Sequence, residues 1–304
     1  MKGRLAIAAL SIGLVAGCSV LGPALPDGPD PRFVPADRSV HPAPRVALVL
    51  SGGAARGFAH VGVIKALEAN GLRPDLVVGA SAGSIVGALY ASGLSGREVE
   101  WAIQRMTGAT FADLSLPGLG LVPGSLGMFT GNELHRFIDR EVRHHRIEDF
   151  PIRFAAIATD LATGSPAVFN AGDVGRAVSA SSAVPGLVQP ARIGDRLYGD
   201  GQISSPVPVE AARKLGALRV IAVDVIYPPT DAALTSAMRV VFQAFTIAAY
   251  RIKQYEIAMA DAVITPDLGH TSGQWSFNER AWLIAAGEEA AVHALPRLRP
   301  LFGP

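Results

Sequence analysis

The 304-residue sequence has a single cysteine, few charged residues and no cluster of basic ones. One cysteine excludes an intramolecular disulfide and leaves Cys18 without a redox partner in the chain. Twenty-seven basic and 26 acidic residues give a formal net charge of +1. That balance argues against a nucleic-acid-binding protein, which carries a concentrated positive surface. The chain also lacks internal repeats, which argues against a solenoid.

Apolar residues, by contrast, make up 49% of the chain and charged residues only 17%. This composition suits a largely parallel sheet covered by helices, because its strands are apolar on both faces. Thr130 and Glu133 have the spacing of a capping box, which predicts a helix from Gly131. Strands are predicted at 46–50, 76–78, 154–158, 167–169, 193–198, 220–225 and 263–264. Helices are predicted at 60–69, 98–106, 131–144, 174–179, 209–215, 237–260 and 281–295, and a further helix follows the turn at 79–84 and ends at 91. Their alternation predicts an α/β fold of three layers, with a mainly parallel central sheet flanked by helices.

The amino terminus has the pattern of a secretion signal. Basic residues precede an apolar run over residues 5–15, and small residues precede Cys18. The pattern resembles the lipobox of bacterial lipoproteins, in which the cysteine is lipidated and becomes the first residue of the mature protein. The alternative is an uncleaved membrane helix, which needs roughly 20 apolar residues. We therefore expect a signal peptide at 1–17 and acyl chains on Cys18 that bind the protein to a membrane.

Ser19 follows Cys18, and by the same resemblance it favours the outer membrane of a bacterial cell envelope over the inner one. Prolines recur among glycine and aspartate through residue 44. Such a segment cannot bury enough apolar surface to fold by itself. We expect residues 18–44 to be a lipidated tether and residues 45–304 to be one folded domain.

A glycine-flanked serine stands where a predicted strand passes into a predicted helix. Gly79 and Gly83 lie two residues on either side of Ser81. In this context the pattern is typical of a nucleophile elbow, a sharp turn that exposes the serine hydroxyl. The alternative is a tight helix-packing turn, because glycine, alanine and serine are abundant here. We favour Ser81 as a nucleophile.

A second glycine-rich turn, containing Gly52, Gly53, Ala54, Arg56 and Gly57, follows the first predicted strand. A phosphate-binding loop would end in Gly-Lys-Ser/Thr, which is absent. A dinucleotide-binding turn would need glycine at position 54 and an acid after the second strand. A purely structural turn remains open. We favour an oxyanion hole whose donors are the backbone N–H groups of residues 52–54.

A serine nucleophile needs a base, and the histidines offer no obvious one. His60 lies on the first predicted helix and is interpreted as structural, while His270 lies in a loop without supporting residues. Their positions disfavour the order Ser, Asp, His of α/β-hydrolases. Asp200, followed by Gly201, offers a carboxylate that would be ionised at neutral pH at its ordinary pKa near 4. Taken alone, the Asp-Gly pair indicates a plain turn rather than a catalytic carboxylate.

In this order, the three motifs resemble those of patatin-like phospholipases: an oxyanion loop at 52–57, a nucleophile elbow at 79–83 and the Asp-Gly motif at 200–201. The resemblance covers about residues 45–266. Further stretches that agree are 158–161, 180–186 and 206–209.

The resemblance implies a Ser-Asp dyad of Ser81 and Asp200, and makes residues 45–304 the catalytic domain. It implies hydrolysis of acyl esters in phospholipids or lysophospholipids through an acyl-enzyme, without a metal or an organic cofactor. The remaining positions that it assigns are the oxyanion donors Gly52, Gly53 and Ala54, the elbow glycines Gly79 and Gly83, the motif glycine Gly201, and Arg56 and Gly57, which shape the loop.

Two residues depart from the family pattern. Ala54 stands where a third glycine is usual, and Gln202 stands where glycine or alanine is usual. These departures leave open a catalytically weak or inactive lipoprotein that binds a lipid or a partner. A peptidase or a thioesterase on the same fold is a further alternative. The segment 108–128 is predicted to be either an apolar lid or acyl funnel, or an ordinary loop packed on the core.

Overall fold

The computed structural model describes residues 28–35, 45–111, 113, 126–143, 145–230, 234–269 and 277–303. The expected signal peptide, Cys18, most of the tether and His270 lie outside these residues. The signal peptide, the lipid anchor and the outer-membrane location therefore stay predictions.

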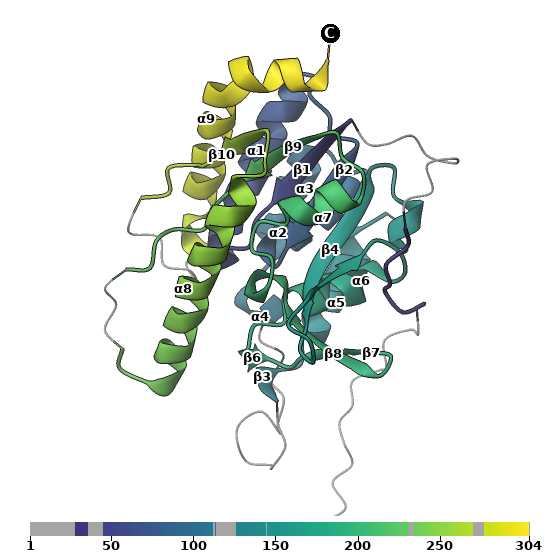
Figure 1. Ribbon diagram of the computed structural model, residues 1–304, viewed down its shortest axis with the longest axis vertical. Coiled ribbons are helices and arrows are strands. Elements are labelled where there is room, and N and C mark those ends of the chain that lie inside the picture. The colour runs from purple at the N-terminus through teal and green to yellow at the C-terminus, as the bar shows by residue number, and fades with distance from the viewer. Residues whose placement is uncertain are drawn as a thin grey trace, which may run out of the picture.

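An eight-stranded sheet forms the middle layer of the domain (Figure 1). Its strands follow the order β10-β9-β1-β2-β4-β8-β7, and β5 pairs with β4. The strands from β10 to β4 are parallel, whereas β5, β7 and β8 pair antiparallel at one side. The predicted mainly parallel sheet is thus confirmed. The strands are β1 (Val46–Leu50), β2 (Leu76–Ala80), β4 (Arg153–Asp160), β5 (Pro166–Phe169), β7 (Ala191–Ile193), β8 (Arg196–Asp200), β9 (Arg219–Val223) and β10 (Ala262–Ile264).

Helices cover both faces of the sheet, as the apolar strands require. In β1, Val46, Leu48 and Leu50 belong to the core on one face, and Ala47 and Val49 belong to the core on the other. The first face is covered by α1 (Phe58–Ala69), α2 (Ala82–Ala91), α3 (Gly96–Arg105), α5 (Asn132–Glu141), α6 (Val174–Ser181) and α9 (Arg280–Leu298). The second is covered by α7 (Val209–Lys214) and α8 (Ala237–Ile257). No helix in the described part of the chain is long and apolar enough to span a bilayer.

Part of the segment 108–128 is ordered into short elements. It begins with α4 (Gly108–Phe111) and ends with β3 (Gly127–Phe129). β3 pairs in parallel with β6 (Gly186–Val188) in a separate two-stranded sheet. Residues 114–125 lie outside the described residues, so the lid and the ordinary loop both remain predictions.

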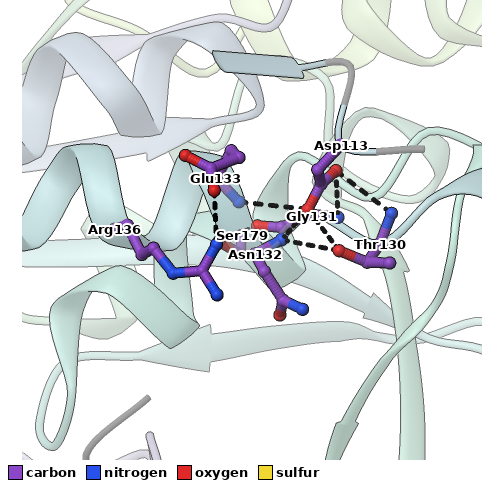
Figure 2. Close-up of polar contacts among 7 residues, drawn as sticks. All are labelled: Asp113, Thr130, Gly131, Asn132, Glu133, Arg136 and Ser179. Carbon is purple, nitrogen blue, oxygen red and sulfur yellow. Dashed lines mark hydrogen bonds and ion pairs between the residues drawn. The ribbon is translucent and has the colours of Figure 1, made fainter. Parts of the chain in front are cut away.

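The capping-box prediction for α5 is wrong. Figure 2 shows the Asp113 carboxylate at the start of this helix. The carboxylate accepts hydrogen bonds from the backbone N–H groups of Thr130 (3.1 Å), Gly131 (3.0 Å), Asn132 (2.7 Å) and Glu133 (3.1 Å). Asp113 satisfies the donors that a helix start leaves open, and the Thr130 hydroxyl accepts the Asn132 N–H (3.2 Å) but not that of Glu133, as a capping box would require. Glu133 instead forms an ion pair with Arg136.

The described part of the tether packs on the domain. The Arg32 N–H donates to the Ala171 carbonyl (2.9 Å), and Asp30 forms an ion pair with Arg176. The Asn170 side chain bonds both the N–H and the carbonyl of Val34. Residues 28–35 therefore follow the surface beside 170–176.

Candidate active site

Strand register brings the three predicted motifs to one edge of the sheet. Leu50 at the end of β1 pairs with Gly79, and Ala80 at the end of β2 pairs with Ile157. On the other side of β4, Asp200 pairs with Ala158, one residue further along. The turn after β1, the turn after β2 and the end of β8 therefore meet around one point. Ligands of open α/β sheets bind at this edge.

Ser81 occupies a strained turn between β2 and α2. Its φ of 51° and ψ of −124° lie in a region that residues with side chains rarely adopt, at a cost of about 1–3 kcal/mol. A Cβ on Gly79 would lie 2.3 Å from the Gly83 carbonyl oxygen, and one on Gly83 would lie 2.1 Å from that of Leu50. The Ser81 N–H donates to Ser181 Oγ (2.9 Å). The two glycines thus permit the close contact that the turn requires.

The structure brings Ser81 and Asp200 into direct contact. Ser81 Oγ donates to Asp200 Oδ2 at 2.8 Å, and the Gln202 N–H donates to Asp200 Oδ1 at 2.8 Å. The Asp200 backbone is fixed as well, because its N–H bonds the Ala183 carbonyl (2.9 Å) and its carbonyl accepts from Thr159 Oγ1 (2.8 Å). The carboxylate is fully buried. One carboxylate oxygen accepts from the serine hydroxyl, and the other accepts from the backbone of the loop that follows Asp200.

Burial raises the pKa of Asp200 to about 7, although hydrogen bonds from Gln202 and Ser81 lower it. The ordinary pKa expected from the sequence is therefore wrong, because a buried carboxylate loses its hydration. A base whose pKa lies near neutral accepts a proton more readily than one at 4. The site thus compensates for the weak intrinsic basicity of a carboxylate.

The first glycine-rich turn forms a short 3-10 helix, Ala54–Gly57, behind Gly53. The prediction of Gly52 as an oxyanion donor is wrong, because the Gly52 N–H already donates to the Pro206 carbonyl (3.0 Å). Among the described residues, the N–H groups of Gly53 and Ala54 have no such acceptor. Ala54 adopts φ 51° and is, with Ser81, one of two non-glycine residues at positive φ in the described chain. Its Cβ is therefore accommodated in the left-handed conformation that a glycine would occupy more easily.

Gln202, the second departure from the family pattern, packs against the same turn. A Cβ on Gly52 would lie 2.2 Å from the Gln202 side-chain oxygen. The Gln202 N–H still bonds Asp200, so the larger side chain leaves the Asp-Gly motif in place. Gly201 permits that turn, because a Cβ there would lie 2.0 Å from the Ile157 carbonyl oxygen.

Glu256 on α8 supports the glycine-rich turn, and the sequence analysis missed it. Its buried carboxylate accepts the Val207 N–H (2.7 Å) and the Ser205 hydroxyl. Pro206, between these two residues, carries the carbonyl that holds Gly52. Burial raises the pKa of Glu256 to about 7 against these hydrogen bonds. The carboxylate thus anchors the segment to which the predicted oxyanion loop is bonded.

Lys253, one helical turn before Glu256 on α8, anchors residues 224–226, which contact the glycine-rich turn through Ser51. It forms a buried ion pair with Asp224 (Nζ to Oδ2, 2.6 Å) and bonds the Ile226 carbonyl. Val225, between them, donates its N–H to Ser51 Oγ (3.0 Å) next to the turn. The sequence signal that could have indicated these two anchors is that Lys253 and Glu256 are charged residues spaced i and i+3 on the apolar side of a predicted helix.

No described histidine is among the hydrogen-bond partners of Ser81 or Asp200. His60 is fully buried, and its Nε2 bonds the Ser51 carbonyl (2.9 Å). Burial lowers its pKa to about 4, so it is neutral at pH 7 and serves as a support of the turn. His135 contacts Asp139 (3.1 Å) and Asp173 (3.2 Å), whose hydrogen bonds raise its pKa to about 9 despite burial. These three side chains have metal-ligand types and spacing, but the imidazolium already compensates the two carboxylates.

Ser81 lies between two pockets. The first has no charged side chain among its described lining residues, and Ser81 lies at its wall. The second contains Ser81, Asp200, Gln202 and Arg56 and is bordered by side chains of α8. The larger apolar side chains of the first are Phe58, Ile85, Val86, Ile103, Met106, Phe111, Val184, Leu187 and Val188. A carbonyl placed at Ser81 would have an apolar chain on one side and a polar group on the other.

Comparison with known proteins adds the family context. Residues 48–213, more than half of the chain, match the family model described as patatin-like phospholipase. Human patatin-like phospholipase domain-containing protein 6 is 38% identical over 188 residues, which cover 59% of this chain and 13% of that protein. An uncharacterized NTE family protein of Mycobacterium tuberculosis is 35% identical over 181 residues, covering 60% and 49%. A lysophospholipase of Aspergillus fumigatus is 37% identical over 186 residues, covering 59% and 12%.

The chain thus spans 12–49% of the length of these curated relatives. Among solved structures, VipD from Legionella pneumophila superposes with a TM-score of 0.49 at 13% identity, covering 83% of this chain and 66% of that one.

Proposed function

The chain belongs to the patatin-like phospholipase family, and from this we propose that it hydrolyses acyl esters of membrane lipids with Ser81 as nucleophile and Asp200 as base. The observation that carries the proposal is the 2.8 Å hydrogen bond from Ser81 Oγ to a buried Asp200 carboxylate. A nucleophile hydrogen-bonded to its base is the arrangement on which covalent catalysis depends, and here it lines two pockets that a substrate could enter.

In the first half of the reaction, Asp200 accepts the hydroxyl proton while Ser81 Oγ attacks the ester carbonyl. The N–H groups of Gly53 and Ala54 stabilise the oxyanion of the tetrahedral intermediate. The bond to the leaving alcohol then breaks, the alcohol takes the proton from Asp200, and the acyl group stays on Ser81. In the second half, Asp200 accepts a proton from water, which attacks the acyl-enzyme. The fatty acid leaves and Ser81 is reprotonated.

The two pockets support a phospholipid or lysophospholipid substrate. The uncharged first pocket suits the acyl chain. Arg56 lines the second pocket, and its buried Nε has no hydrogen-bond partner in the described chain. Burial lowers the pKa of Arg56, and among the described residues only Tyr227, whose ring centre lies 5.4 Å from the guanidinium, has an electrostatic effect on it. A phosphate group would compensate this cation, which gives Arg56 a role beyond shaping the loop.

The lipid anchor belongs to the same proposal. Acyl chains on Cys18 would hold the enzyme at the outer membrane of a bacterial envelope, where lipid substrates are concentrated. Residues 28–35 lie against the domain, so the free part of the tether would be shorter than residues 18–44.

Release of fatty acid from a substrate panel tests the function. We expect the detergent-solubilised full chain to hydrolyse phosphatidylcholine or lysophosphatidylcholine, with a Ser81→Ala preparation as the blank. Preference for a peptide amide or an acyl thioester would favour the peptidase or thioesterase alternative. No turnover, together with no labelling by a fluorophosphonate, would favour the lipid- or partner-binding alternative.

The pH dependence should report the raised pKa of Asp200. Only the ionised carboxylate accepts a proton, so kcat/KM should fall about tenfold per pH unit below about pH 7 and level off above it. The measurement is kcat/KM for a soluble short-chain ester between pH 5 and 9, with thermal melts over the same range as control. An acid limb centred near pH 4 would contradict the burial effect on Asp200.

A further inference from the structure

Helix α8 has an outward face without charge over its N-terminal half. Val240 is 49% exposed, Val241 45% and Ile247 43%. A helix on the surface of a globular protein normally places charged and polar side chains outward. The exposed positions of this face are Ala237, Val240, Val241, Ala244, Ile247 and Ala248.

The inward face of the same stretch borders the active site. Phe242, Phe245 and Thr246 line the second pocket together with Ser81 and Asp200. The first half of α8 is therefore apolar on both sides, although its outward side chains are exposed in the described part of the structure. A helix of this kind is expected to be covered on all sides.

The N-terminal end of α8 also lies next to β6, which lines the first, apolar pocket, called the acyl pocket below. Met238 packs on Gly186 of β6, since a Cβ on that glycine would lie 3.2 Å from the methionine methyl carbon. Leu187 and Val188 of β6 line the apolar pocket. In Figure 1 this end of α8 lies at the same end of the molecule as β3 and β6. Leu126, next to β3, and Leu234, before α8, add exposed apolar side chains (57% and 53%).

Size and charge distinguish between possible occupants. Residues 237–248 span about 18 Å of helix, and a strip about 10 Å wide has an area of roughly 180 Å². A stable protein interface buries about 800 Å² per partner, so a second copy of the chain is disfavoured. Between residues 234 and 250 the sequence has one charged residue, Arg239, and no aspartate or glutamate. An apolar strip with a flanking cation fits the interfacial layer of an anionic bilayer.

We propose that the outward face of α8 inserts into the surface of an anionic lipid bilayer and thereby presents the Ser81 pockets to the membrane. The proposal rests on the proposed function for its purpose, whereas the contact itself is independent of catalysis. The acyl pocket, the second pocket and the inserted helix then form one path from the lipid layer to the dyad.

Site-specific labelling tests this contact directly. Because Cys18 is the only cysteine, the full chain with Cys18→Ser accepts a single new thiol. Val240→Cys on α8 and Val292→Cys on α9 have nearly equal exposure, 49% and 47%, and each would carry a nitrobenzoxadiazole dye. Vesicles of phosphatidylglycerol should shift the emission of the dye at position 240 to the blue and leave the dye at position 292 unchanged. Cys18→Ser removes any contribution from an acyl anchor.

The outcomes separate this surface from the proposed function. No shift at position 240, or equal shifts at both positions, would overturn the surface whether or not a soluble short-chain ester is hydrolysed. A shift at position 240 without ester hydrolysis would support the surface and count against the hydrolase. A shift that needs no vesicles and rises with protein concentration would mean that a second copy covers the face, which also overturns the proposal.

A vesicle-binding series gives the magnitude. Val240→Asp and Ile247→Asp should each weaken sedimentation with phosphatidylglycerol vesicles by at least about tenfold, because each removes an inserted aliphatic side chain. Val292→Asp, the matched control on α9, should bind as the parent does. All three should hydrolyse the soluble ester at the parental rate. Unchanged vesicle binding by both α8 variants would refute the insertion.

Discussion

Ser81→Ala and Asp200→Asn should each lower kcat/KM for ester hydrolysis by at least about 10³-fold. Alanine removes the atom that attacks the carbonyl. Asparagine keeps the shape of Asp200 and an oxygen for the Gln202 N–H, but it cannot accept the proton that Ser81 Oγ donates across 2.8 Å. The measurement is steady-state turnover of a soluble ester, with fluorophosphonate labelling as a second readout. Because the two residues act as one unit, the double variant should be little worse than either single variant.

The stability of these variants separates loss of chemistry from loss of fold. A carboxyl whose pKa is raised in the folded state gives more stability at low pH, and that contribution is lost as pH rises through about 7. Asp200→Asn removes the buried charge, so its melting temperature at pH 8 should equal or exceed that of the parent. A folded Asp200→Asn protein with parental turnover would show that the base is elsewhere.

His60 supplies the control for the alternative base. Its Nε2 bonds the Ser51 carbonyl and does not reach Ser81. His60→Gln can keep a donor for that carbonyl while removing an imidazole that is neutral at pH 7. Turnover should remain within about tenfold of the parent, since only the support of the turn changes. A well-folded His60→Gln protein as inactive as Ser81→Ala would move the role of base to the histidine.

The fold and the turn around Ser81 were predictable because both depend on local pattern, whereas Asp200 was singled out only through the resemblance to a family. The buried residues of β1 alternate between two cores, and such strands are apolar throughout. The elbow follows from glycines that must contact the backbone around Gly79 and Leu50. These constraints act within a few residues of the motif, so the sequence displays them.

The remaining features depend on partners far apart in the chain. Gly52 looked like a free donor, but the Pro206 carbonyl occupies its N–H. Asp113 takes the amides that a capping box at Thr130 would have used. The pKa of Asp200 and the anchoring role of Glu256 follow from burial among elements that only the tertiary structure brings together. Local spacing carries no information on these contacts.

Gly83→Ala should remove both stability and activity, because the elbow is built on a contact between backbones. The added Cβ would lie 2.1 Å from the Leu50 carbonyl oxygen and 2.6 Å from that of Ser51. Neither atom belongs to a side chain that could rotate away, so α2 would have to move from the end of β1. We expect a loss of at least about 3 kcal/mol in the free energy of unfolding, measured by urea denaturation.

The ester-hydrolysing activity of Gly83→Ala should also fall, even in the fraction of the protein that still folds. The helix that moves begins at Ala82, next to Ser81, while the predicted oxyanion donors stay with β1. A displacement of about 1 Å between nucleophile and donors costs on the order of 10²-fold in rate. Gly108→Ala is the matched control, because a Cβ there meets nothing within 4 Å. If Gly83→Ala melted and turned over like Gly108→Ala, the close packing of the elbow on β1 would be disproved, and with it the reason for a glycine at position 83.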